Sequence, residues 1–170
     1  MIPSCLSLDD EAFVKEADII LLAGGDAVRG WNVLAGNGLK DLLIKKYKEG
    51  CLLIGISAGA VQLGLFGLAE AEHSSSQLVD MFKLVPFMIG VHESKQEWKS
   101  LSGTIRLLDG TTKGIGISSG GGMIYYPDQS LEAIRFALTE FSIENGAVRN
   151  CLLAPQQSDQ RWTRPFGLTN

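Results

Sequence analysis

The stretch CLLIGISAGAVQLG, residues 51–64, places a serine between two glycines directly after a short apolar run. The run CLLIGI (51–56) is typical of a buried strand. Residues 58–71 are rich in small side chains, and we expect them to form a helix packed against that strand. Ser57 therefore falls on a predicted strand-to-helix turn.

The sequence Gly55-Ile56-Ser57-Ala58-Gly59 matches the G-x-S-x-G pattern of a nucleophile elbow. In such a turn the strand and the helix approach closely, so residues two before and two after the serine must be small. The turn exposes the serine Oγ at the amino end of a helix, where the helix dipole favours negative charge. The Ala58 amide would then point to where an oxyanion forms. The alternative is an ordinary glycine-rich turn that binds a phosphate or nothing.

A nucleophilic serine needs a base, and the chain contains 2 histidines. His73 lies in the polar stretch EAEHSSSQ, which is typical of a solvated loop. His92 directly follows the apolar run LVPFMIGV and is predicted to stand at the carboxyl end of a strand. That position makes His92 the candidate base for Ser57, with a purely structural histidine as the alternative.

The rest of the chain indicates an α/β protein. Strands alternating with helices favour right-handed crossovers and a parallel sheet with helices on both faces. In such sheets the chemistry gathers at the carboxyl ends of the strands. The expected elements are a helix at 9–17, a strand at 18–23 ending at Gly24-Gly25, an amphipathic helix at 38–50, an apolar run at 82–91, a helix at 94–110, short strands around 114–118 and 123–128, and a hairpin turn at Asn145-Gly146.

Composition excludes several classes of function. A formal net charge of -4 argues against a broad nucleic-acid-binding face. No apolar run is long enough to predict a membrane span, and the first residues lack the features of a signal peptide. Three widely spaced cysteines favour free thiols in a reducing cytoplasm. We therefore expect one cytoplasmic domain over residues 1–154, a polar tail at 155–170, and no nucleic-acid or membrane partner.

Four separated motifs resemble one known family. In order they are ADIILLAGGDAVRGWNVL, YKEGCLLIGISAGA, LVPFMIGVHE and GIGIS. Together they are similar to the dipeptidase E and cyanophycinase family of serine peptidases, and the similarity extends over about residues 9 to 150. The resemblance implies a flavodoxin-like fold shared with class I glutamine amidotransferases. This is a three-layer α/β sandwich with a mostly parallel central sheet and a nucleophile elbow.

The resemblance also implies roles for individual residues. Ser57 would be the nucleophile, His92 the general base, and the backbone of Gly25 and Ala58 the oxyanion hole. The substrates would be small peptides, cleaved beside an amino-terminal aspartate or a β-linked aspartate. Neither a metal nor a cofactor is implied.

The chain departs from the family pattern at the acid that orients the histidine. In the cyanophycinase branch an acid follows the last core strand, where this chain has Ser118 and Ser119. In the dipeptidase branch an acid lies between the serine and the histidine. Glu70 and Glu72 both fall near that spacing, and the sequence does not choose between them. Solvated glutamates at a helix end are the alternative.

A second departure is at the amino terminus. The family has further strand–helix units before the strand that ends in Gly24-Gly25, whereas this chain begins about 17 residues before that strand. We therefore expect an exposed sheet edge and an uncovered apolar surface. Two copies of the chain could associate through that edge.

Three functions remain open on the sequence. The first is a serine hydrolase that uses Ser57 and His92, with Glu70 or Glu72 steadying the imidazole. The second is a catalytically weak or inactive relative that acts as a binding or scaffold protein. The third is an amidotransferase-like domain, which ranks last because such domains usually carry cysteine at the elbow.

Overall fold

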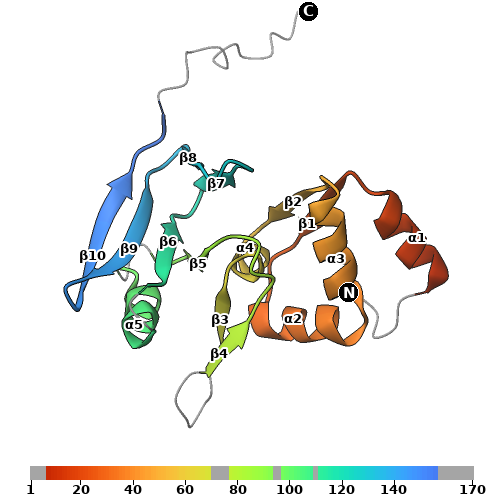
Figure 1. Cartoon of the computed structure of the whole chain (residues 1–170), viewed down its shortest axis with the longest axis horizontal. Helices are drawn as coiled ribbons and strands as arrows, with labels where there is room; N and C mark the ends of the chain where they lie inside the picture. The colour runs from red at the N-terminus through yellow and green to blue at the C-terminus, as the bar shows by residue number, and fades with distance from the viewer. Residues whose placement is uncertain (1–6, 70–76, 94–96, 109–110, 157–170) are drawn as a thin grey trace, which may run out of the picture.

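A computed structural model describes residues 7–69, 77–93, 97–108 and 111–156 of the chain. Helices and strands alternate through the first half, and strands dominate the second (Figure 1). The fold is therefore α/β, as predicted. The elements are α1 (Leu8–Glu16), β1 (Ile19–Leu22), α2 (Ala27–Gly36), α3 (Leu39–Lys48), β2 (Leu52–Gly55), α4 (Ala58–Leu63), β3 (Phe66–Ala69), β4 (Gln77–Asp80), β5 (Phe87–Val91), α5 (Lys99–Leu107), β6 (Lys113–Ile117), β7 (Gly122–Tyr125), β8 (Leu131–Ile134), β9 (Leu138–Glu144) and β10 (Ala147–Leu153).

Strands β1 and β2 form a two-stranded parallel sheet, in which Ile19 pairs with Leu52 and Leu21 pairs with Ile54. One face of this sheet is covered because alternate residues of β1 point toward α2 and α3. The buried cluster beneath these helices consists of Leu22, Trp31, Leu34, Leu39, Leu43, Met81 and Phe82. Burying these apolar side chains is the main source of stability in this half of the chain.

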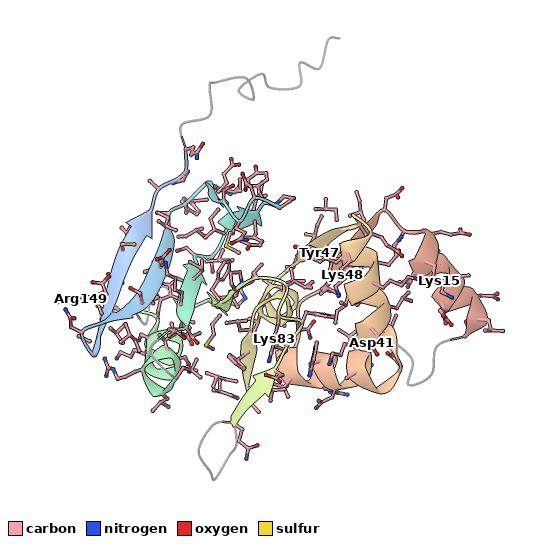
Figure 2. The ribbon with its side chains drawn as sticks, in the orientation of Figure 1. Lys15, Asp41, Tyr47, Lys48, Lys83 and Arg149 are labelled. Carbon is pink, nitrogen blue, oxygen red and sulfur yellow. The ribbon has the colours of Figure 1, made fainter. Side chains whose placement is uncertain are left out.

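The opposite face of the β1–β2 sheet is apolar and exposed. Ile19 and Leu21 are 60% and 55% exposed, and their register partners on β2 are exposed as well. Tyr47 and Lys48 lie at the end of α3, near these strands (Figure 2). The uncovered apolar surface that the sequence predicts is therefore present in the described part of the chain.

The second sheet has the strand order β10-β9-β6-β5. Buried side chains of β5, β6 and β9 lie on both of its faces, whereas β10 is largely exposed. Phe87, Ile89, Ile115 and Leu138 pack in a buried cluster on one face. On the other face α5 packs Leu101, Trp98 and Ile105 against Met88 and Phe141.

A single, mostly parallel central sheet is not what the described residues form. The parallel pairs are β1–β2 and β5–β6, whereas β6–β9 and β9–β10 are antiparallel. The antiparallel pairs β3–β4 and β7–β8 each form a separate two-stranded sheet. The β9–β10 pair has to be antiparallel because only Asn145 and Gly146 connect the strands. Both residues have positive φ, 52° and 75°, which confirms the predicted hairpin turn.

The helix expected over residues 58–71 is wrong beyond Leu63. Helix α4 ends there, and Phe66–Ala69 forms β3, which pairs with β4. The reason is tertiary: the Leu65 amide donates to the carbonyl of Phe87 on β5 at 3.1 Å, which holds the chain extended beside that strand. Residues 70 and 71 lie outside the described residues. Helix α4 contacts both β2 and β5 and so sits between the two sheets (Figure 1).

One further helix and two element boundaries also differ from the prediction. Helix α2 was not expected, although Asp26 caps it by accepting a hydrogen bond from the Arg29 amide at 2.9 Å. Helix α5 covers Lys99–Leu107 of the predicted 94–110, and residues 94–96 and 109–110 lie outside the description. Strand β5 begins only after Pro86, which lacks the amide hydrogen that a strand uses.

Candidate functional site

Ser57 occupies a strained turn between β2 and α4. Its φ of 55° and ψ of -114° lie outside the regions that non-glycine residues favour. A Cβ added to Gly55 would lie 2.6 Å from the Cα of Ala60, and one added to Gly59 would overlap the carbonyl oxygen of Leu22 on β1. Neither position tolerates a side chain. This is the close approach of strand and helix that the sequence predicts for an elbow.

His92 stands at the carboxyl end of β5, directly across from the elbow. The Ser57 Oγ and the His92 Nε2 are 2.7 Å apart and share a hydrogen bond. Like Ser57, His92 has a positive φ, 66°. Both side chains are exposed or half-buried, and substrate can reach them. The two residues lie 35 positions apart in sequence, and the packing of α4 against both β2 and β5 brings them together.

A general-base role for His92 requires one particular tautomer of the ring. For Nε2 to accept from the serine hydroxyl, the ring proton has to reside on Nδ1. Among the described residues, Ser57 is the one polar partner of the His92 side chain. Nothing in that part of the chain therefore holds Nδ1 through a hydrogen bond in this structure.

The two candidate oxyanion donors flank the elbow. Ala58 is the first residue of α4, where an amide has no carbonyl partner within the helix. Gly25 follows the end of β1, and its neighbour Gly24 packs so closely that an added Cβ would lie 3.4 Å from the Ser57 Cβ. The structure thus places both backbone segments beside the serine. Their role in binding an oxyanion stays a prediction.

Two hollows adjoin the site. One is a groove of about 640 Å³ lined by Ser57 and His92, mostly by aliphatic side chains, and by the loop at 118–122. Within the residues that the structure describes, no Asp, Glu, Lys or Arg lines it. The other is a cavity of about 820 Å³ lined by Gly25 and by polar residues of the α2 start, Asp26, Arg29 and Asn32. The groove at the elbow is therefore apolar, whereas the hollow beside Gly25 carries charged and polar side chains.

Several predicted candidates lie outside the described residues. Glu70, Glu72 and His73 belong to the segment 70–76, so the structure does not choose a triad acid. Within the described ranges, no group of three or more His, Cys, Asp or Glu side chains could hold a metal ion. No helix in those ranges has the length and apolar character to cross a membrane.

The structure also brings Ser118 and Ser119 to the site, where they line the same groove as His92. From the sequence, these two serines stand only where the cyanophycinase branch carries an acid. The pairing of β5 with β6 is the feature that would have predicted the position of these serines near His92. Strands β5 and β6 are parallel and in register up to Val91 opposite Ile117, so His92 and Ser118 each come directly after the last residue pair.

The family model of peptidase family S51 matches residues 6–134. This chain belongs to peptidase family S51. A comparison of the sequence with curated proteins found no match.

Two solved structures resemble this S51 chain. One is a peptidase from an acI-B1 actinobacterium, with a TM-score of 0.64 and 21% identity, over 86% of this chain and 61% of that one. Another is a peptidase E candidate from Listeria monocytogenes EGD-e, with a TM-score of 0.49 and 18% identity, over 85% of this chain and 64% of that one. The first likeness supports the fold. The S51 chain described here spans less than two thirds of the length of either protein.

Proposed function

We propose that this chain is a serine-type peptidase in which Ser57 is the nucleophile and His92 the general base. The observation that carries the proposal is the 2.7 Å hydrogen bond between the Ser57 Oγ and the His92 Nε2. The strained backbone of Ser57 is a second support, because such strain persists mainly where function requires it. Membership of peptidase family S51 agrees with this reaction class.

In the first step, His92 takes the hydroxyl proton while the Ser57 Oγ attacks the peptide carbonyl carbon. A C–O bond forms, the peptide C–N bond breaks, and His92 returns the proton to the leaving amine. In the second step, water attacks the acyl-enzyme carbon and gives its proton to His92. The bond between the acyl carbon and the Ser57 Oγ then breaks, His92 returns the proton to that Oγ, and the acid product leaves.

The carbonyl oxygen becomes negative in both steps. The amides of Ala58 and Gly25 are the groups that we expect to bind it. Removing one such donor typically slows an acyl transfer by about 100- to 1000-fold. A side-chain substitution does not remove a backbone amide. These two donors are therefore best tested with substitutions that change the backbone conformation of the turn.

We further propose small peptides with an aspartyl residue beside the cleaved bond as substrates. The resemblance to the dipeptidase E and cyanophycinase family supports this class. So does the cavity next to Gly25, where Arg29 offers a guanidinium group to a carboxylate. Among the described residues Arg29 has no ion pair of its own.

The remaining part of the proposal concerns architecture. We infer a three-layer sandwich around a mostly parallel sheet for the fold as a whole. Its support is that β1–β2 and β5–β6 are each parallel and that α4 packs on both pairs. Their carboxyl ends carry Ser57 and His92, as expected for an α/β site.

A binding or scaffold protein with weak or no activity is the second candidate. One observation favours it: no carboxylate of the described residues contacts His92. A carboxylate partner holds the imidazole in the correct tautomer. Without it the catalytic rate falls, because a wrong tautomer lowers the rate by about ten-thousandfold in a serine triad.

A fluorophosphonate probe separates the two candidates. It reacts with an activated serine, and peptide mass spectrometry locates the label. We expect label on Ser57 that is lost in Ser57→Ala and reduced at least about 100-fold in His92→Ala, the usual share of a general base. Ser142→Ala is the matched control, because Ser142 lies on β9, two strands away from β5.

The same experiment can refute the proposal. Circular dichroism first shows that each variant is folded. A folded wild-type protein that takes no label at Ser57 supports the scaffold and contradicts the peptidase. Label on Ser57 that persists unchanged in His92→Ala contradicts the role of His92.

A further inference from the structure

We propose that Ser118 is the positioning residue for His92, and that its hydroxyl accepts a hydrogen bond from the Nδ1–H of the imidazole. The inference deepens the proposed function and rests on it for its catalytic consequence. It assigns to a neutral hydroxyl the place that a carboxylate fills in a Ser-His-Asp triad.

The strand register places the two residues together. Strands β5 and β6 pair in parallel, Gly90 opposite Gly116 and Val91 opposite Ile117. The next residues on the two chains are His92 and Ser118. Figure 1 shows β6 on one side of β5 and α4 with β2 on the other. The imidazole bonds Ser57 through Nε2, and Ser118 follows the strand next to the one that His92 ends, so we infer that Nδ1 faces the Ser118 side.

The Ser118 hydroxyl is available for this contact. Its side chain is half-buried and lines the groove that also contains His92. Among the described residues no hydrogen bond uses the hydroxyl, whereas the Ser118 carbonyl accepts from the Gly121 amide at 2.9 Å and fixes the loop. A hydroxyl both donates and accepts and rotates freely about its bond. Ser118 and His92 are not bonded in this structure, and catalytic hydrogen bonds often tighten only with substrate present.

The described carboxylate closest along the chain is engaged elsewhere. Glu93 follows His92, but its Oε2 accepts a hydrogen bond from the Leu101 amide at 3.3 Å, at the start of α5. Ser119 is the other hydroxyl of the loop, and it is exposed rather than half-buried. Of the two hydroxyls, Ser118 is the half-buried one and directly follows the β5–β6 pairing, which favours it as the partner of the ring.

The tautomer of His92 tests the contact directly. The chain has 2 histidines, so His73→Gln leaves one imidazole, whose ¹⁵N chemical shifts report the proton position. We expect mainly the Nδ1–H form in this background. Ser118→Ala should move population to the Nε2–H form, and Ser118→Thr, which keeps the hydroxyl, should restore it. An unchanged tautomer in Ser118→Ala, or a shift caused by Ser119→Ala instead, would overturn the assignment.

The rate of fluorophosphonate labelling supplies the functional readout. We expect about a tenfold loss in Ser118→Ala, on the scale of one net hydrogen bond, and recovery in Ser118→Thr. Ser118→Asp should label faster than wild type because a carboxylate stabilises the imidazolium that forms during attack. A Ser118→Asp variant that labels more slowly than Ser118→Ala would contradict the inference.

The two proposals fail separately. Labelled wild-type protein with an unaltered tautomer in Ser118→Ala refutes the role of Ser118 and leaves the peptidase intact. Unlabelled wild-type protein with the expected tautomer shift refutes the peptidase and leaves the contact between Ser118 and His92 standing.

Discussion

At the scale of single residues, the site depends on backbone strain held in place by close packing. Ser57 and His92 both have positive φ, a conformation that costs a non-glycine residue about 1–3 kcal/mol. The turn at Ser57 persists because Gly55 and Gly59 let β2, α4 and β1 approach closely. The glycines therefore set the direction in which the serine Oγ points.

This packing predicts the effect of adding one methyl group. Gly59→Ala would drive a Cβ into the carbonyl of Leu22, so we expect a loss of about 1–3 kcal/mol in the free energy of unfolding. The matched control is Gly103→Ala, within α5, where an added Cβ meets no atom within 4 Å. It should stabilise the protein by about 0.5–1 kcal/mol because alanine is the better helix former. Urea unfolding measures both, and a Gly59→Ala protein as stable as wild type would contradict the explanation.

At the scale of elements, the fold depends on which strands find each other. The β9–β10 hairpin follows from local turn chemistry, because Asn145 and Gly146 adopt the left-handed conformation that a two-residue connection needs. The β3–β4 hairpin does not follow from local preference. It forms because the chain after α4 is held against β5, and this overrides the small-residue pattern that favoured a longer helix.

The hairpin turn can be tested by itself. Gly146 has a φ of 75°, so Gly146→Ala should destabilise the protein by about 1 kcal/mol. Asn145→Gly should change the stability by less than about 0.5 kcal/mol, because glycine adopts the φ of 52° without strain. Thermal unfolding followed by circular dichroism compares the two. Equal effects of both substitutions would count against this account of the turn.

At the scale of the whole molecule, the notable feature is the uncovered face of the β1–β2 sheet. Ile19, Leu21, Leu52 and Ile54 alternate with covered residues along the two strands and form a continuous apolar surface. Surfaces of this kind mark interaction sites or aggregation-prone regions. Association of two copies through the exposed edge of this sheet stays a prediction, which sedimentation at several concentrations would test.

The exposed face should bind a hydrophobic dye. We expect Leu21→Thr combined with Ile54→Thr to lower the fluorescence of anilinonaphthalene sulfonate with a small effect on stability, because these side chains are 55% and 41% exposed. The control is Leu43→Thr, which is 2% exposed and should cost more than about 2 kcal/mol in unfolding free energy. Dye fluorescence that is unaffected by the double substitution would show that the surface is covered in solution.

Much of this architecture could be predicted from particular residues. The run ending at Gly55, the glycine two after Ser57, and the Asn145-Gly146 pair each act within a few positions, so their patterns predicted an elbow and a hairpin that the structure contains. Helix α2 was not predicted, although Asp26 is a residue type that commonly caps the amino terminus of a helix. The β3–β4 hairpin and the mixed second sheet were missed because they depend on pairing between distant segments.

By itself, the sequence determined that a serine would stand on a tight strand-to-helix turn and that a histidine would end a strand, because sterics and hydrophobic pattern act locally along the chain. Only the tertiary structure decided that the Ser57 Oγ and the His92 Nε2 lie 2.7 Å apart and that Ser118 follows the neighbouring strand. The physical reason is that strand pairing and helix packing join segments far apart in the chain, and their energies depend on the assembled core rather than on any one stretch of residues.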